Sequence, residues 1–299
     1  MAATRLGAKT AYLGRIGADV FGQRLLALWS QEDVSAEGMI VEEGADTGLY
    51  FVNHDAQGHH FSDRRKDSAA SHLAPADISE HLLSRARWLH FSGISQAISA
   101  SAVEATRHAM ALAKKHGTRI SYDLNFRPRL WSAEAGLSAA NSVLRHCDVF
   151  FFSVDEVRLL TGLTSVTDVI NWAHAGGAKL VALKLGADGC LVSSDDKQTP
   201  VPSVRIDCVD ATGAGDCFAG AFLSRLCAGQ DAVDAAAFAN AAAALSTQGY
   251  GVVAPLPRKE MVTGLLGRAP LPAGLDIRAA QTAGTGSAFV ACCSTDTSP

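Results

Sequence analysis

Residues 207–223 have the sequence DCVDATGAGDCFAGAFL, and this stretch decides which fold the chain is expected to adopt. The small residues Gly213, Ala214 and Gly215 let backbone N–H groups come close to a ligand. Apolar residues then recur at helical spacing, which predicts that a helix begins at this loop. Exposed N–H groups and the helix dipole make such a helix start a natural anion site. Asp216, in the first turn, is placed to accept a proton from a hydroxyl group that attacks a bound phosphoryl group.

The regions before this stretch alternate between short apolar segments and longer segments with helical periodicity. From residue 75 onward, strands are predicted near 87–91, 118–123, 148–152 and 179–185, with helices between them. This alternation predicts an α/β fold in which a mostly parallel sheet is covered by helices on both faces. Ligands of such sheets bind at the carboxyl ends of the strands.

The remaining regions complete the predicted organisation. Residues 1–36 and 63–267 are expected to form the α/β core. Residues 37–62 carry short β-prone pieces separated by Gly and Asp, and these are expected to form a small β flap. Residues 268–299 are rich in Ala, Gly, Ser, Thr and Pro without a sustained apolar period, and are expected to be disordered.

Composition narrows the class of protein. The 299 residues are 48% hydrophobic and carry a net charge of −4, so the overall charge does not favour a nucleic-acid partner. No stretch reaches the ~18 apolar residues of a membrane span, and the first residues lack the apolar region of a secretory signal. The seven cysteines show no CxxC spacing, and a reducing, cytoplasmic location is expected.

The string DATGAGD at residues 210–216 closely resembles the C-terminal signature of the ribokinase-like (PfkB-type) carbohydrate kinases, and the similarity extends along most of the chain. It implies a three-layer α/β/α fold with a mostly parallel sheet and a small β flap. It also implies transfer of the γ-phosphate of ATP to a sugar with Mg²⁺ as cofactor, Asp216 as the catalytic base and residues 213–215 as the anion hole. In many relatives the positions of Asp210 and Thr212 help to hold a monovalent cation such as K⁺.

Other residues take roles through the same resemblance. Glu156 lies in the segment SVDE, where the family has Asn-x-x-Glu, and it would organise Mg²⁺ through water, although Ser153 replaces the usual Asn. Lys184 and Gly186, in the segment KLG, match the nucleotide-binding side, and Asn240 matches a position near the adenine. Without the resemblance, Glu156 is an acid in the first turn of a helix and the segment KLG an ordinary turn.

Two further segments indicate the acceptor. The segment DLNFRP follows a predicted strand that its proline ends, so Asn125 and Arg127 are expected at the carboxyl edge of the sheet. Together with Arg65 in RRKDSAAS and Tyr50 in TGLY, these segments resemble those of the family branch that phosphorylates 2-dehydro-3-deoxygluconate (KDG), a sugar acid. The resemblance implies that these four residues contact the sugar acid. Two guanidinium groups suit a carboxylate.

Some features leave other functions open. Asp63 and Arg64 stand where KDG kinases usually have aromatic residues, and kinases of fructose or 5-dehydro-2-deoxygluconate share parts of the Asp-x-Asn-x-Arg pattern. Residues 1–9 align with the end of the family's first helix, so its opening strand and Gly-Gly-x-x-x-Asn segment are not in the printed sequence. This predicts a less stable and poorly active product, and it makes a non-catalytic nucleotide- or sugar-binding remnant the alternative to a kinase. The family also implies a homodimer formed through the β flap.

Overall fold

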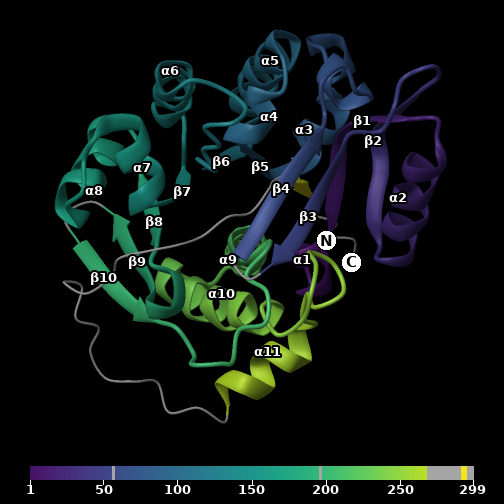
Figure 1. Ribbon diagram of the computed structural model, residues 1–299. Coiled ribbons are helices and arrows are strands. Elements are labelled where there is room, and N and C mark those ends of the chain that lie inside the picture. Colours follow the sequence, from purple (N-terminus) through teal and green to yellow (C-terminus); the bar gives the residue numbers. More distant parts are fainter. Residues whose placement is uncertain (56–57, 195–196, 268–290, 295–299) are drawn as a thin grey trace.

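A central sheet organises the molecule, and the computed structural model describes residues 1–55, 58–194, 197–267 and 291–294. The strands are β1 (Thr10–Gly17), β2 (Val34–Glu42), β3 (Leu49–Asp55), β4 (Gly58–Arg64), β5 (Ala86–Ser92), β6 (Arg119–Asp123), β7 (Val149–Ser153), β8 (Leu180–Lys184), β9 (Gly189–Ser194), β10 (Lys197–Pro202) and β11 (Ala291–Ser294). Nine of them form one sheet in the order β10-β9-β8-β7-β6-β5-β11-β1-β2 (Figure 1). The run from β5 to β8 is parallel, as is the pair of β1 and β2.

Helices cover both faces of this sheet. They are α1 (Ala2–Arg5), α2 (Val20–Gln31), α3 (Glu80–Arg85), α4 (Gly93–Ala97), α5 (Ala100–His116), α6 (Ala133–Leu144), α7 (Val154–Thr161), α8 (Val166–Ala175), α9 (Ala214–Cys227), α10 (Ala232–Ser246) and α11 (Lys259–Leu266). The core on one face contains residues of α3, α5, α6, α7 and α8, and the core on the other contains residues of α1, α9, α10 and α11 (Figure 1). These three layers confirm the predicted α/β fold.

The apolar sequence of β7 shows why this strand lies in the middle of three layers. Phe150 and Phe152 belong to the core on the α5 side, whereas Val149 and Phe151 belong to the core on the α9 side. Successive side chains of a strand point to opposite faces, so a strand covered on both faces needs an uninterrupted apolar run. All four side chains are at most 1% exposed.

The helix ends follow from capping residues in the sequence. Ser99 accepts the N–H of Ala102 at the start of α5, and Gly117, at φ 71°, ends this helix in the left-handed conformation that glycine adopts without strain. Ser153 and Glu156 form a capping box at the start of α7. The strand ends and the helix starts are therefore fixed locally, and the loops between them gather at the carboxyl edge of the sheet.

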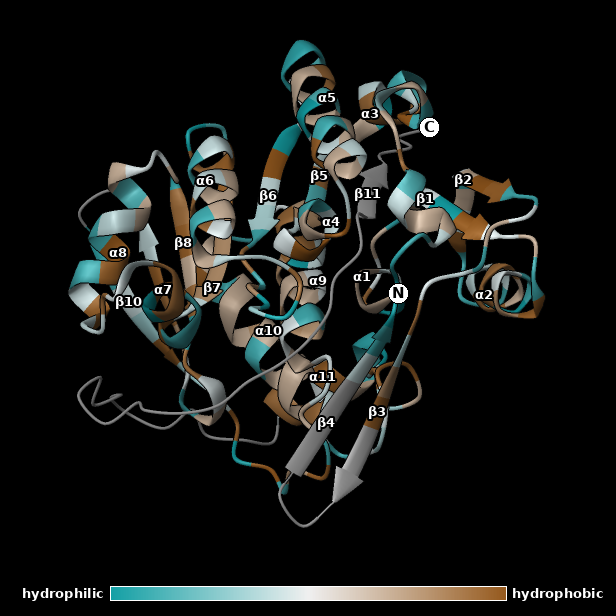
Figure 2. Ribbon diagram, turned by 45° about the horizontal axis from the view of Figure 1, so that its top comes forward, coloured by the Kyte–Doolittle hydropathy of each residue, from teal (hydrophilic) through white to brown (hydrophobic). Residues whose placement is uncertain are grey.

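The β flap is smaller than the predicted range of 37–62. Residues 37–42 belong to β2, which pairs with β1 at the edge of the central sheet, so this part of the prediction was wrong. β3 and β4 alone form the separate two-stranded antiparallel sheet (Figure 2). Asp19 anchors the chain just before β3, because it accepts both the N–H and the hydroxyl of Thr47, at 2.7 and 2.8 Å.

The predicted disordered tail contains a strand. β11 lies between β1 and β5 and runs antiparallel to both, with Cys293 opposite Thr10 and Cys292 opposite Leu89. The prediction of disorder was therefore wrong for 291–294, and the rest of the tail beyond residue 267 lies outside the described residues. Within the described part of the chain, no helix is both long and apolar enough to span a membrane.

Candidate active site

The loop before α9 forms the turn that the sequence predicted. Gly213 is the N-cap of α9 at φ 80°, a left-handed conformation that glycine adopts without strain. The carboxylate of Asp210, 1% exposed, accepts the N–H groups of Thr212 at 2.9 Å and Gly251 at 3.0 Å. The loop is therefore held at two points by one acid. The monovalent-cation role of Asp210 and Thr212 stays a prediction.

The first turn of α9 lines a cavity of about 1170 Å³. Ala214, Gly215 and Asp216 all contribute to the cavity wall, whereas Gly213 does not. The N–H of Ala214 donates to the carbonyl oxygen of Ala211 at 3.1 Å, so a ligand must share that hydrogen bond. Gly215 is thus the member of the predicted anion hole best placed to present its amide to a phosphoryl group.

The carboxylate of Asp216 lies in this wall, and the residue is half-buried. Burial raises the pKa of Asp216 well above its ordinary value, and repulsion by the charge of Asp123 adds to the rise. Asn125 Nδ2 approaches Asp216 Oδ1 at 3.5 Å. A carboxylate with raised proton affinity beside an anion-binding turn is suited to accept a proton from a hydroxyl group.

Other charged side chains meet Asp216 in the cavity. Lys184 Nζ contacts Asp123 Oδ2 at 2.8 Å and Oδ1 at 3.0 Å. Burial lowers the pKa of Lys184, but the charges of Asp123 and Glu156 outweigh burial and raise it above the ordinary value. Arg127 NH1 lies 3.8 Å from Glu156 Oε1. The cavity thus brings together five charged residues, the acids Asp123, Glu156 and Asp216 and the cations Arg127 and Lys184. Because three acids face two cations, an incoming anion meets no large excess of positive charge.

Glu156 combines a capping role with a place in the cavity wall. Its Oε2 accepts the N–H of Ser153 at 2.8 Å, and the Ser153 hydroxyl lies 3.1 Å away. Ser153, which replaces the family's Asn, therefore serves as the N-cap of α7. Among the residues that the structure describes, no group of three or more His, Cys, Asp and Glu is arranged to hold a metal ion. A Mg²⁺ ion carried by nucleotide phosphates needs only one or two protein carboxylates, and Glu156 fits that requirement.

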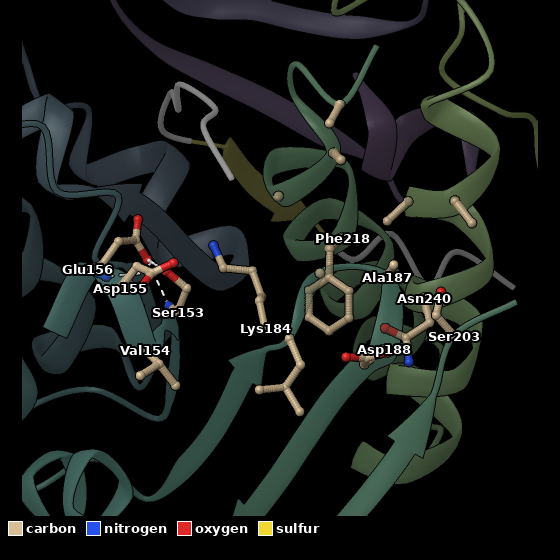
Figure 3. Close-up of a pocket in the computed structure, with 18 of the residues that line it drawn as sticks. Ser153, Val154, Asp155, Glu156, Lys184, Ala187, Asp188, Ser203, Phe218 and Asn240 are labelled. Carbon is tan, nitrogen blue, oxygen red and sulfur yellow. Dashed lines mark hydrogen bonds between the residues drawn. The ribbon is translucent and has the colours of Figure 1, made fainter. Parts of the chain in front are cut away.

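The predicted nucleotide side borders the same cavity. Gly186, at φ 60°, and Asn240 are both in the wall, and Figure 3 shows Asn240 lining the same pocket as Phe218 and Asp188. Asn240 Nδ2 donates to the carbonyl oxygen of Val201 at 2.8 Å, so this amide ties α10 to β10. Its predicted contact with the adenine stays a prediction.

Two predicted acceptor residues lie outside the cavity wall: Tyr50 is on β3, and Arg65 directly follows β4. The guanidinium carbon of Arg65 lies 5.1 Å from the centre of the Tyr50 ring, and Arg65 Nε lies 3.3 Å from Asp63 Oδ1. Burial raises the pKa of the Tyr50 hydroxyl, and the charge of Asp216 raises it further. Tyr50, on β3, is therefore within electrostatic range of Asp216. Asn125 and Arg127, by contrast, are in the cavity wall itself.

The sequence did not reveal the role of Asp123. It begins the segment DLNFRP at the end of β6, and its ion pair with Lys184 joins residues on β6 and β8, across the end of β7. Each residue ends its strand, and that shared position is the only signal that a sequence offers. Pairing between two strand ends that are not neighbours depends on the strand order, which the sequence did not specify.

The mostly parallel sheet covered on both faces, the small antiparallel sheet and the cavity at the carboxyl edge together have the architecture of a ribokinase-like α/β protein. Residues 1–259 match the family described as pfkB family carbohydrate kinase. The chain belongs to this family, and it is therefore a phosphotransferase with an alcohol group as acceptor.

Relatives and solved structures agree with this assignment. Fructokinase-1 from Zea mays is 34% identical over 279 residues, which cover 90% of this chain and 86% of that protein. A solved E. coli protein described as ribokinase II, in complex with ATP and Mg²⁺, has a TM-score of 0.83 at 29% identity, covering 90% of this chain and 86% of that one. Fructokinase from Vibrio cholerae O395, with fructose, ADP and a calcium ion, has a TM-score of 0.82 at 29% identity, covering 89% and 88%. Similarity to KDG kinases in particular stays a prediction.

Proposed function

We propose that this chain transfers the γ-phosphate of ATP to a primary hydroxyl of a neutral ketohexose, most simply fructose. The observation that supports the reaction best is the position of Asp216 beside the amide of Gly215 in one cavity wall. A proton acceptor and an anion site must lie together for phosphoryl transfer to a hydroxyl group, because most of the catalysis comes from positioning and charge stabilisation.

The proposed reaction uses the chain's own groups in a simple sequence. Asp216 accepts the proton of the sugar hydroxyl as its oxygen attacks the γ-phosphorus. The bond from phosphorus to the bridging oxygen breaks, and ADP leaves with that electron pair. The amide of Gly215 holds an oxygen of the phosphoryl group during transfer. Mg²⁺, when bound with the nucleotide, supplies positive charge to the phosphates.

The charges around the acceptor arginines support a neutral sugar. Arg65 lies 3.3 Å from the Asp63 carboxylate, and Arg127 lies 3.8 Å from that of Glu156. A sugar acid would compete with these carboxylates for the guanidinium groups and would bring a further negative charge toward Asp216. A neutral ketohexose meets neither cost, and fructokinases are among the relatives at 34% identity.

KDG is the second candidate acceptor, and one observation favours it. Arg127 is in the wall of the cavity, and Arg65 lies against Tyr50, which senses the charge of Asp216. If Asp63 turned away from Arg65 when substrate binds, both arginines would face the acceptor. The choice therefore depends on whether the contact between Asp63 and Arg65 persists in the complex.

A substrate panel tests the proposal. ADP release is measured with ATP and Mg²⁺ over fructose, KDG and 5-dehydro-2-deoxygluconate, and the phosphorylated product is identified by mass. We expect the highest kcat/KM with fructose. A higher kcat/KM with KDG than with fructose would make KDG the acceptor. If none of the sugars is phosphorylated but nucleotide still binds, the result would favour a non-catalytic protein.

A further inference from the structure

The cavity contains an ion pair that the reaction above does not use. Lys184 ends β8 and Asp123 ends β6, and β7 lies between these strands. Lys184 Nζ nevertheless reaches both carboxylate oxygens of Asp123, at 2.8 and 3.0 Å. The side chain of Asp123 is 1% exposed and that of Lys184 is 18% exposed. The pair is thus enclosed at the strand ends, with only the lysine partly open to the cavity.

The ammonium group of Lys184 also lies against the anion-binding turn. A Cβ atom placed on Gly215 would lie 3.4 Å from Lys184 Nζ, so this ammonium group and the backbone of Gly215 border the same space. Figure 3 shows Lys184 extending into the pocket between Glu156 and Phe218. A phosphoryl group held by the amide of Gly215 is therefore within reach of Lys184.

Asp123 supplies what an enclosed ammonium group needs. A lysine with a flexible four-carbon stem and no partner in this position would lose hydration, and would give up its proton or turn toward water. Asp123 is itself held in place, because its Oδ1 accepts the N–H of Asn125 at 3.2 Å. A fixed carboxylate thus holds a flexible cation at one point beside the anion site.

We propose that Lys184 is a further catalytic residue, which applies positive charge to the phosphoryl group during transfer, and that Asp123 is the positioning residue that holds it there. This inference rests on the proposed function, because it requires the γ-phosphate to bind at Gly215. Negative charge spreads over the phosphoryl oxygens in the transition state, and a cation already in place stabilises that charge without reorganisation. A purely structural ion pair would instead link β6 to β8 and change stability alone.

Single and double variants separate these two roles. Lys184→Gln is expected to lower kcat about 100-fold with little change in the KM for the sugar, since a donor to the transition state is lost. Asp123→Asn is expected to lower kcat about tenfold in the wild-type background and to have no further effect in Lys184→Gln, because it acts through that lysine. Equal losses in both backgrounds, or an unchanged kcat with a lowered Tm, would overturn the proposal.

A matched control comes from the other end of β8. Lys179 pairs with Asp148 at 2.6 Å, and its side chain is 74% exposed. Lys179→Gln removes the same charge from an ion pair far from the cavity, and kcat is expected to stay at the wild-type value. A loss in this control as large as that in Lys184→Gln would show that net charge rather than position is responsible, and would also overturn the proposal.

A binding measurement tests Lys184 without any acceptor. ADP with aluminium fluoride imitates the phosphoryl group in transfer, and calorimetry compares its affinity with that of ADP alone. Lys184→Gln is expected to weaken binding with aluminium fluoride about 100-fold while leaving ADP alone nearly unchanged. Equal weakening of both ligands contradicts the proposal. If no sugar is phosphorylated, the proposed function fails, but this binding measurement still decides the role of Lys184. If Asp216→Asn abolishes phosphoryl transfer and Lys184→Gln does not lower it, the proposed function stands and only the proposed role of Lys184 fails.

Discussion

The turn around Asp216 and the β3–β4 flap both contribute to the site, but they are built differently. Around Asp216, Asp123 and Lys184 end strands, Glu156 and Asp216 lie in the first turns of helices, and only Arg127 comes from a loop; both faces of the sheet beneath them are covered by the two cores. The flap has only two strands, and Phe51 on β3 is 57% exposed. The comparison shows that the groups proposed for phosphoryl transfer are held at the edge of a covered central sheet, whereas Tyr50 and Arg65, proposed to contact the acceptor, lie on or beside a small exposed sheet.

Replacement of the base gives the sharpest test of the first region. Asp216→Asn removes the proton acceptor and is expected to lower kcat by about 1000-fold. The Tm is expected to stay the same or rise, because a carboxylate repelled by Asp123 and enclosed by protein is removed. Steady-state kinetics and thermal melts measure both. Near-normal kcat would show that proton transfer does not depend on Asp216.

A substitution at Gly213 tests whether the turn before α9 requires the left-handed backbone conformation. Gly213→Ala introduces backbone strain at φ 80° and places a Cβ atom 3.1 Å from Val252 Cγ1. We expect a loss of about 1–3 kcal/mol in the free energy of unfolding, with a parallel rise in the KM for ATP. Gly264→Ala in α11, where no atom would crowd the new Cβ, is the control and is expected to be neutral or stabilising. Equal melts for the two variants would contradict a rigid turn.

The pH dependence of activity tests whether the surroundings of Asp216 raise its pKa. The pKa of Asp216 lies well above the ordinary 3.8, so kcat/KM should fall about tenfold per pH unit below that raised pKa. The folded-state pKa exceeds the unfolded one, so the protonated acid contributes stability at low pH that is lost as the pH rises through the folded value. Asp216→Asn should therefore gain stability relative to wild type at high pH. An acid limb centred near 3.8 would refute the raised pKa.

A change in the flap is expected to have the smallest effect on kcat and to alter specificity instead. Asp63→Asn removes the carboxylate that lies 3.3 Å from Arg65 Nε. We expect kcat/KM for KDG to rise several-fold, which corresponds to about 1 kcal/mol of transition-state stabilisation, while kcat/KM for fructose changes little. Glu43→Gln, an exposed acid before the flap, is the control. If the KDG to fructose ratio does not change, Asp63 does not determine the acceptor.

The core of the fold was predictable from sequence because its signals are local. The apolar run of β7, the Ser99 and Gly117 caps of α5 and the small residues before α9 each specify structure within a few neighbours. The edge strand β2 was misassigned to the flap, since short β-prone pieces do not show which sheet they join. β11 was missed because the single short apolar run AFVACC at 288–293 was judged together with the glycine-, serine- and threonine-rich sequence around it.

The candidate site was predictable in its parts but not in its contacts. The resemblance located Asp216, Gly215, Lys184 and Glu156, and the structure brings these residues to one cavity. It did not indicate that Lys184 pairs with Asp123, because that contact depends on strand order. It also did not indicate that the side chain of Asn240 would be engaged by the backbone of β10.

The position of β11 has a consequence for how the chain reaches its native state. The strand lies between β1 and β5, so two early parts of the sheet are joined through residues near the far end of the printed sequence. Pairing across such a separation is slow to form, and until it does, β1 and β5 each present an unpaired edge. Refolding should therefore depend on protein concentration, with those edges as the sites where molecules first associate, and an added peptide with the sequence ACCS and its neighbours should suppress that association.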